Sequence, residues 1–376
     1  MAEFMGKAGF QWFVGVVEDR KDPQTLGRLR VRCLGYHTEG LDKLPTADLP
    51  WAHVMNPITS ATVSGLGQSP LGAVEGTWVV GFFQDGGDAQ QPIIIGTLPG
   101  VPSELPDTGS KKGFQDAVNG AYPKYKNETD VNRLSVNDED LPHSSLTIRK
   151  ADLTTKIGQA DFNPVDLGRA FLSPISLEGD DGTEFSEPTT PYDAEYPFNH
   201  VYESEAGHIR EMDDTPGKER IHERHASGSG YEIHPDGSKV TRVKKDNYTI
   251  VTGDDFAHIK GNSSTTVDGG IRVFVNADGS TDDHNYTIQV GNNANVNIQV
   301  DKGDVNVVTS QGDINLKSGK NIHMDATQGI YMKSKLVSAE IDGNWVESTQ
   351  NKTESTGTHV MNASEQDING DVINLN

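Results

Sequence analysis

Apolar side chains are scarce in this sequence. Hydrophobic residues make up 34% of its 376 residues and aromatic residues 7%, whereas a globular chain of this length usually has a larger apolar share. Glycine is abundant instead, with 40 residues. This mixture argues against helices and favours many short strands joined by turns. The composition therefore predicts an all-β protein.

Cysteine is nearly absent, since Cys33 is the single one in the chain. One cysteine excludes a disulfide bond within the chain, which fits assembly in a reducing cytoplasm. Cys33 stands in the segment RLRVRCLGY, whose pattern is that of a strand. We therefore interpret Cys33 as a structural residue and not as a reactive thiol.

Positive charge is also in short supply. The chain has 32 Lys and Arg against 55 Asp and Glu, for a formal net charge of −23. Such a chain repels phosphate backbones, and the short mixed segment 239–245 is no basic patch, so we expect no binding to nucleic acid. No apolar run approaches membrane-spanning length, and the first twelve residues contain no apolar signal core.

Residues 1–100 contain five strand-like segments in succession and no helix signal. Breakers such as Pro45 and the glycines of 65–72 separate them. Five strands in about a hundred residues predict a small closed barrel, with the OB fold as the leading choice, because closure removes exposed sheet edges. The segments are 12–19, 27–36, 50–57, 76–83 and 91–98.

Residues 101–185 differ in character. Apolar residues thin out, and acidic residues, Pro and Ser fill segments such as SVNDEDLPHSS and LEGDDGTEFSEPTTP. A segment of this length without helical or strand periodicity is long for a loop inside a domain. We predict an extended acidic connector that lies along a partner surface or is partly mobile.

Residues 186–376 are a succession of short strand patterns. Asp236-Gly237 between alternating apolar positions predicts a hairpin. From about residue 285 the pattern becomes periodic, with apolar pairs that recur in steps of nine, nine, eight and eight residues between polar turns. The pairs are Val296 and Ile298, Val305 and Val307, Ile314 and Leu316, Ile322 and Met324, and Ile330 and Met332.

These repeats are too short to enclose a core alone, because a β-helix formed by one chain usually needs rungs of about twenty residues or more. Three chains wound about one axis could bury the apolar pairs on that axis and leave the polar neighbours in water. We therefore predict a homotrimer whose residues 186–376 form an intertwined triple-stranded β-helix, with the ten residues of the pairs as its core. A single-chain β-helix is the alternative.

Two patterns invite a chemical interpretation. His222 and His225 flank a glutamate, but a zinc protease motif needs two histidines four apart on a helix. Here the spacing is three, and alternation along a strand would place the two rings on opposite faces. Acidic pairs such as Asp213-Asp214 fit turns better than the two-carboxylate cleft of a glycosidase. We predict no catalytic residue, no metal and no cofactor.

Four segments carry a resemblance to a known family. WFVGVVEDRKDPQTLGRLRVR at 12–32, LPWAHVMNPITSA at 49–61 and PLGAVEGTWVVGFFQDG at 70–86 resemble the N-terminal OB domain of the central spike proteins of contractile-phage baseplates. YPFNHVYESEAGHIREMDDTPGKERIHERH at 196–225 resembles the entry to their triple-stranded β-helix. The valine–glycine repeat spike of type VI secretion shares this last motif in a weaker form.

The resemblance implies a structural function. A trimeric spike of this family sits at the tip of the tail tube in the virion, is assembled in the host cytoplasm, and punctures the outer membrane. The lysozyme domain of some members has too little room in 101–185, so we expect no enzyme. The alternatives are a carbohydrate-binding or carbohydrate-degrading tailspike, disfavoured by the few aromatic residues after 256, and a type VI secretion spike.

The resemblance also implies two protein partners. We expect a separate baseplate hub ring protein at the N-terminal barrel, because the barrel pattern starts near residue 12 with no ring-forming region before it. Some relatives hold iron at the tip with a His-x-His pair, but His359 stands alone here, so we predict a small tip-capping protein. Its interface is expected at Ile368, Val372, Ile373 and Leu375.

Overall fold

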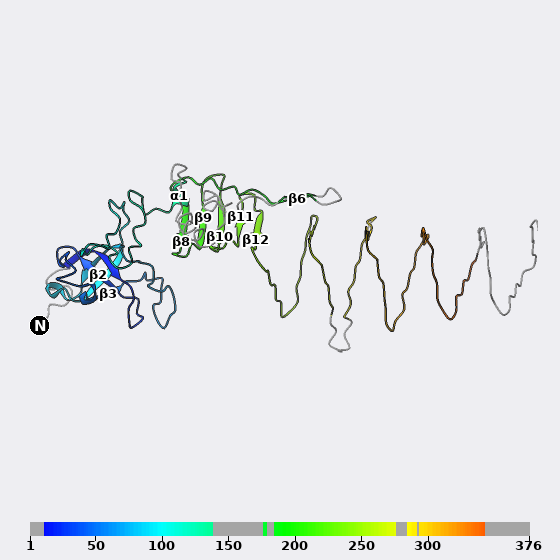
Figure 1. The fold of residues 1–376 in the computed structure, drawn as a ribbon, viewed down its shortest axis with the longest axis horizontal. Coiled ribbons are helices and arrows are strands. Elements are labelled where there is room, and N and C mark those ends of the chain that lie inside the picture. The colour runs from blue at the N-terminus through cyan, green and yellow to red at the C-terminus, as the bar shows by residue number, and fades with distance from the viewer. Residues whose placement is uncertain (1–10, 138–175, 179–183, 276–283, 292, 343–376) are drawn as a thin grey trace, which may run out of the picture. The chain divides into compact units, whose positions relative to one another are not determined.

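The computed structural model describes residues 11–137, 176–178, 184–275, 284–291 and 293–342. The chain divides into two units that meet between Arg272 and Val273. The helical turns among the described residues are short: η1 (Thr46–Asp48), η2 (Gly86–Asp88) and α1 (Arg133–Val136) (Figure 1). None of the helices in these ranges is long and apolar enough to cross a membrane. The predicted all-β class is confirmed.

The N-terminal strands form a closed barrel, as predicted. Their spatial order is β1-β2-β3-β5-β4, and β1 pairs with both β2 and β4, which closes the ring. Neighbouring strands are antiparallel except β3 and β5, which are parallel. Each strand lies within, or one residue beyond, a predicted segment. The strands are β1 (Gln11–Asp19), β2 (Leu29–Cys33), β3 (Trp51–Val54), β4 (Trp78–Phe83) and β5 (Pro92–Thr97).

Alternate side chains of these strands fill the barrel with an apolar core. Gly81 of β4 lets β5 and the ring of Phe13 approach the backbone of β4 closely. A Cβ atom at this position would lie 2.1 Å from the carbonyl oxygen of Ile93 and 2.6 Å from the ring of Phe13. Burial raises the pKa of the Cys33 thiol to about 12, so this thiol stays protonated at neutral pH. The core residues are Phe13, Val17, Leu29, Val31, Cys33, Ala52, Val79, Phe83 and Ile94.

A buried ion pair joins the barrel to the segment that follows it. Nε and Nη2 of Arg32 donate to the two carboxylate oxygens of Glu18, at 2.7 and 3.0 Å. The same carboxylate accepts a hydrogen bond from the backbone N–H of Phe114, at 2.8 Å. Gly113 leaves room for this contact, since a Cβ atom there would lie 2.1 Å from Arg32 Nε. The first part of the predicted connector therefore lies against the barrel.

The rest of the predicted connector is described only in part. Strands β6 (Ser176–Glu178) and β7 (Glu184–Ser186) form a two-stranded antiparallel sheet. Before them, Asn132 caps the N-terminus of α1 (Arg133–Val136), because its side chain accepts a hydrogen bond from the backbone N–H of Leu134. The segment from 187 to 195 then leads into a larger sheet.

The second sheet is an antiparallel meander in the order β12-β11-β10-β9-β8 (Figure 1). A turn at 214–219 joins β9 to β10, with Gly217 at a φ of 77°. The predicted Asp236-Gly237 hairpin is confirmed: it joins β11 to β12, and Gly237 has a φ of 85°. The strands are β8 (Asn199–Glu203), β9 (Ile209–Asp213), β10 (Arg220–Arg224), β11 (Gly230–Ile233) and β12 (Lys239–Arg242).

Beyond β12, the described residues of the single chain contain no helix and no strand. In Figure 1 the second unit runs as extended arms joined by narrow bends. These bends recur, for example at 301–303, 310–312, 319–320 and 327–328. An extended backbone without a partner strand leaves its N–H and C=O groups unpaired, so this chain by itself does not complete a sheet here. The predicted triple-stranded β-helix stays a prediction.

Candidate functional site

The sheet β8–β12 has two unlike faces. One face, here called the covered face, lies under α1 and residues 187–195, and it is lined mostly by buried polar and charged side chains. The opposite face, here called the open face, carries several exposed apolar and aromatic side chains. The covered face comprises Asn199, Ile209, Glu211, Asp213, Arg220, His222, Arg224 and Glu232. The open face comprises His200, Tyr202, Arg210, Met212, Ile221, Glu223, Tyr231 and Ile233.

Arg220 is the centre of an ionic network on the covered face. Its Nη2 donates to Glu211 Oε1 at 2.8 Å, and its Nη1 donates to Glu232 Oε1 at 2.7 Å. All three side chains are inaccessible to solvent, and the ring of Tyr192 lies over the guanidinium, 4.8 Å from its carbon. Buried charges are tolerated only when they are paired and hydrogen-bonded, as they are here.

Glu211 has further partners in the same network. Its second oxygen lies 2.5 Å from His222 Nδ1, and its first accepts a hydrogen bond from the side chain of Asn199 at 3.0 Å. Burial alone would raise the pKa of Glu211, but the hydrogen bond from His222 and the charge of Arg220 together lower it below its ordinary value. The carboxylate is therefore held in its charged form.

The two histidines of the 221–225 segment differ in burial, and His225 follows the last residue of β10. His222 is buried in the ionic network, with 1% of its surface exposed. His225 is exposed, and its ring lies tilted against that of His208, at a centroid distance of 4.4 Å and an interplanar angle of 43°. The described residues contain no group of three or more histidine, cysteine or acidic side chains that could hold a metal ion. His222 of this segment is part of the packing of the covered face.

Acid should weaken the sheet through Glu211. Because its pKa is lowered in the folded state, this carboxylate contributes stability that is complete above its ordinary value of 4.5 and is lost as the pH falls through the folded-state value. Urea unfolding at one protein concentration should show stability falling below about pH 4.5. The Glu211→Gln variant should decline less steeply over this range, and an equally steep decline would contradict the assignment.

The open face presents a row of apolar side chains across the sheet. Met212 lies opposite His200 on one side and Ile221 on the other, and Ile221 lies opposite Ile233. Met212, Ile221 and the ring of Tyr202 are exposed in the single chain. Cross-strand neighbours of this kind usually pack against another layer. Among the described residues of the single chain, no layer buries these side chains.

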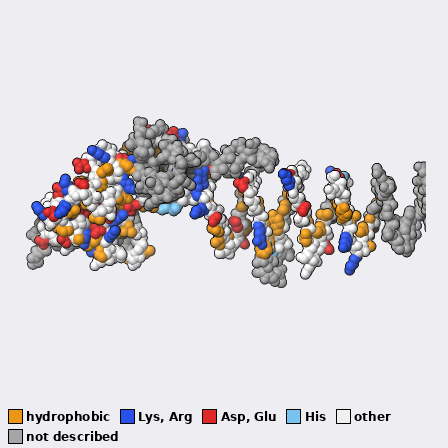
Figure 2. All heavy atoms as spheres, viewed as in Figure 1, with side chains coloured by type: hydrophobic (Ala, Val, Ile, Leu, Met, Phe, Trp, Pro, Cys, Tyr) orange, Lys and Arg blue, Asp and Glu red, His pale blue; other side chains and the backbone are white. Residues whose placement is uncertain are grey.

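The predicted core pairs show the same property more strongly. All ten side chains, from Val296 to Met332, are exposed in the single chain, and hydrophobic side chains lie open along the extended arms in Figure 2. The first member of each pair is 52–58% exposed and the second 67–75%. The single chain therefore does not bring these residues together into a core. The predicted tip residues Ile368, Val372, Ile373 and Leu375 lie outside the described residues.

The structure extends the repeat toward the N-terminus. Bends at 252–253, 260–261 and 268–269 follow one another in steps of eight, well before residue 285, where the sequence periodicity was expected to begin. Each bend ends a Val-x-Gly or Ile-x-Gly triplet, namely Val251 to Gly253, Ile259 to Gly261 and Val267 to Gly269. The three β-branched side chains are exposed, like the core pairs. The triplet spacing is the sequence signal that would have found them.

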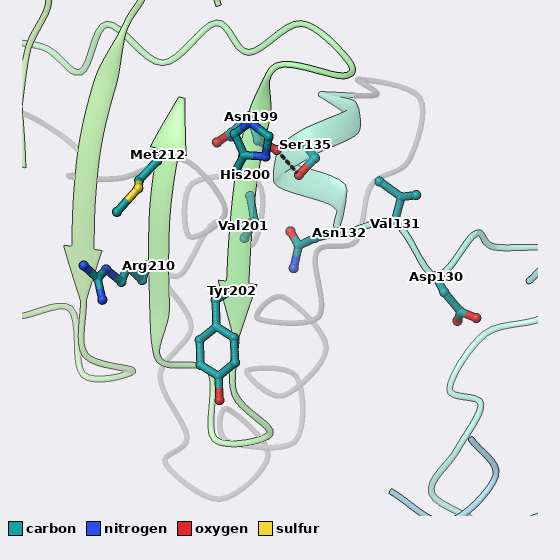
Figure 3. Close-up of a pocket in the computed structure, with 10 residues that line it drawn as sticks. All are labelled: Asp130, Val131, Asn132, Ser135, Asn199, His200, Val201, Tyr202, Arg210 and Met212. Carbon is teal, nitrogen blue, oxygen red and sulfur yellow. Dashed lines mark hydrogen bonds between the residues drawn. The ribbon is translucent and has the colours of Figure 1, made fainter. Parts of the chain in front are cut away.

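An open pocket of about 650 Å³ lies at the β8 edge of the sheet, beside α1 (Figure 3). Ser135 bridges its two sides, because its hydroxyl donates to the carbonyl oxygen of Asn199 at 2.6 Å. Asp130 is the single carboxylate among the lining residues, so they do not supply the pair that glycosidase chemistry needs. The lining residues are Asp130, Val131, Asn132, Ser135, Asn199, His200, Val201, Tyr202, Arg210 and Met212.

Comparison with known proteins gives one family and two relatives. The family described as the Gp5 N-terminal OB domain matches residues 37–167. Protein Gp5 of Vibrio phage KVP40 is 40% identical over 294 residues, which cover 71% of this chain and 65% of that protein. The pre-baseplate central spike protein Gp5 of Enterobacteria phage T4 is 42% identical over 156 residues, 40% of this chain and 26% of that protein. The matches thus cover less than two thirds of either relative.

Proposed function

Since this chain belongs to the family of the phage Gp5 proteins, we propose that it is the structural central spike of a contractile-tail baseplate, a homotrimer that punctures the cell envelope. One relative is named as a pre-baseplate central spike protein, which supports a place in the baseplate of the virion. Assembly would take place in the host cytoplasm, in keeping with the single buried cysteine.

The observation that carries the proposal is the exposure of the apolar pairs between 296 and 332. A soluble monomer rarely exposes so regular an apolar series over so great a length. Three copies wound about one axis would bury all the pairs and would also supply the strand partners that the extended backbone lacks. The Val-x-Gly and Ile-x-Gly triplets at 251–269 would add further rungs of the same kind.

The open face of β8–β12 supports the same assembly. Its apolar row, Met212, Ile221 and Ile233, would meet the equivalent rows of two other copies, while the ionic network stays under α1 and residues 187–195 on the outer side. Such an arrangement accounts for a sheet whose charged face is buried and whose apolar face is open in the single chain. The β8–β12 sheets would then form the beginning of the shaft.

A shaft of this construction acts mechanically. Contraction of the tail sheath would drive it forward, and its narrow section would concentrate the force on a small area of the outer membrane. Continuous backbone hydrogen bonding about a dry core supplies stiffness, and the net charge of −23 keeps the rod soluble. We propose no enzymatic step, and turnover of murein or host polysaccharide by the full chain would contradict this part of the proposal.

The partners follow from the two ends of such a spike. The barrel would dock onto a baseplate hub ring protein, and a small capping protein would cover the tip at Ile368, Val372, Ile373 and Leu375. Without a cap, the last rung would expose apolar side chains and unpaired strand edges, which recruit other strands. No cofactor or metal enters the proposal.

The mass of the protein in solution tests the assembly directly. We expect light scattering on the purified full chain to give three times the 40.8 kDa of one chain, because the described residues beyond β12 form no sheet within a single chain. If dilution lowers the measured mass, the chains that dissociate from the trimer should unfold at the same time. A folded, soluble monomer or dimer would contradict the proposal.

A further inference from the structure

The loop between β3 and β4 has an unusual composition. Residues 55–74 contain no charged side chain and no histidine, although 23% of the whole chain is charged. Surface loops of an acidic protein usually carry charge, since charged side chains keep them solvated. This loop instead exposes four branched aliphatic side chains, at Ile58, Val63, Leu66 and Leu71.

The loop is folded on itself by side-chain hydrogen bonds. Asn56 Nδ2 donates to the carbonyl oxygen of Gln68 at 3.0 Å, and the backbone N–H of Gln68 donates to Ser60 Oγ at 2.8 Å. These bonds bring the two ends of a thirteen-residue segment together, which is the arrangement of an Ω-loop. Gly67 fits this closure, because it has a φ of 90° and a Cβ atom there would lie 2.5 Å from Ser60 Oγ.

The aliphatic side chains project away from this closed segment. Ile58 is fully exposed, at 102%, and Leu71 is 76% exposed, while Val63 and Leu66 are exposed to a similar degree. None of the four belongs to the barrel core. A loop held by its own hydrogen bonds can present apolar groups without a large loss of conformational entropy on binding, so the display is preorganised.

The chemistry of the loop selects the kind of partner. It has no Lys or Arg for phosphate or anionic lipid, and no aromatic ring for stacking on a sugar or a base. A second copy of this chain is a poor match, because its exposed apolar rows, on the open face of β8–β12 and at 296–332, are the ones that the proposed trimer would bury, and the pocket beside β8 has charged lining residues. A groove lined by uncharged apolar side chains on a different protein fits best.

We propose that the loop 55–74, called here the aliphatic loop, inserts into an apolar groove of a different protein and is the main docking contact of the barrel. This inference rests on the proposed function, in which the barrel docks onto a baseplate hub ring protein, and it locates that contact. Aliphatic groups buried at the centre of an interface dominate its affinity. The rest of the barrel surface would contribute complementarity.

Leu66→Asp and Ile58→Asp in the full chain test the proposal, with Gln24→Asp as the control. Gln24 is an exposed residue of the turn between β1 and β2, outside the aliphatic loop, so this change adds the same charge to the barrel surface without altering the loop. Binding is titrated by calorimetry against the purified hub ring protein of the same virus. Light scattering and thermal unfolding of each variant verify assembly and folding.

We expect the two aliphatic variants to bind at least about 30-fold more weakly than the wild type, the effect of losing one hot-spot residue. The Gln24→Asp control should bind like the wild type, and all variants should keep the wild-type mass. Wild-type affinity in both aliphatic variants would overturn the loop proposal and leave the proposed docking of the barrel intact. A wild-type chain that does not bind the hub protein would overturn both. A loss of assembly in the variants would assign the loop to contacts between copies and overturn the proposed partner.

Discussion

Ile314→Asp should prevent assembly of the homotrimer, and Asn315→Asp should not. In the proposed trimer Ile314 lies in the core, so the variant would bring three carboxylates together on one axis without a counter-charge. Burial of an unpaired charge costs several kcal/mol, and the cost applies to each of the three chains. Asn315 follows directly in the sequence, so in the proposed trimer it would point to the other side of the strand and keep its added carboxylate in water.

Both variants add one negative charge to the same strand of the proposed trimer. In Ile314→Asp the charge lies on the inner face, and in Asn315→Asp it lies on the outer face. Size-exclusion chromatography with light scattering should give the trimer mass for Asn315→Asp and a monomeric or aggregated chain for Ile314→Asp. Val305→Asp and its neighbour Asn306→Asp should repeat the contrast one rung earlier. Normal assembly of the Ile314 and Val305 variants, with failure of the asparagine variants, would mean that the opposite face lies inward.

Arg220→Ala should open the β8–β12 sheet. The substitution leaves Glu211 and Glu232 buried without their shared cation, and removal of one partner from a buried ion pair typically costs about 3–5 kcal/mol. Lys218→Ala is the control, because Lys218 forms an exposed ion pair with Asp193 at 3.4 Å in the turn of the same sheet. An exposed pair of this kind contributes about 0–1 kcal/mol.

Hydrogen–deuterium exchange of peptides that cover β9, β10 and β11 measures the effect where it arises. Since about 1.4 kcal/mol corresponds to a factor of ten, exchange in Arg220→Ala should be at least about a hundredfold faster than in the wild type. Exchange in peptides of the barrel should be unchanged, because the ionic network does not reach the barrel core. Equal exchange in the Arg220 and Lys218 variants would show that the network does not stabilise the sheet.

The barrel and the hairpin were predictable from sequence because their signals are local. Each of the five barrel strands is an uninterrupted apolar or alternating run between Gly and Pro breakers, and Asp236-Gly237 favours the positive φ that the β11–β12 turn requires. The apolar pairs of 296–332 are also a local sequence pattern, but in the proposed trimer their burial would depend on contacts with other copies of the chain.

Other features were decided by contacts between residues far apart in the sequence. Glu18, which pairs with Arg32, also accepts a hydrogen bond from the backbone N–H of Phe114, 96 residues further along the chain. Nothing in the polar segment 101–137 of the sequence indicates that this segment would lie against the barrel. The exposed, self-closed form of the aliphatic loop also depends on hydrogen bonds across it, from Asn56 and Ser60 to Gln68.

The sequence by itself determined the class of the protein: an all-β chain with a closed barrel, followed by short alternating strands whose apolar pairs lack a partner within the chain. It determined this because strand periodicity and turn residues act over a few neighbours. Only the tertiary structure decided which face of β8–β12 is covered. Alternation separates Glu211 from Met212 but does not say which of them is buried, since that choice depends on whether α1 and Tyr192 cover one face and leave the other open. Arg220, Glu211 and Glu232 are buried there because they pair with one another within one chain, whereas the apolar row of the open face is exposed in that chain.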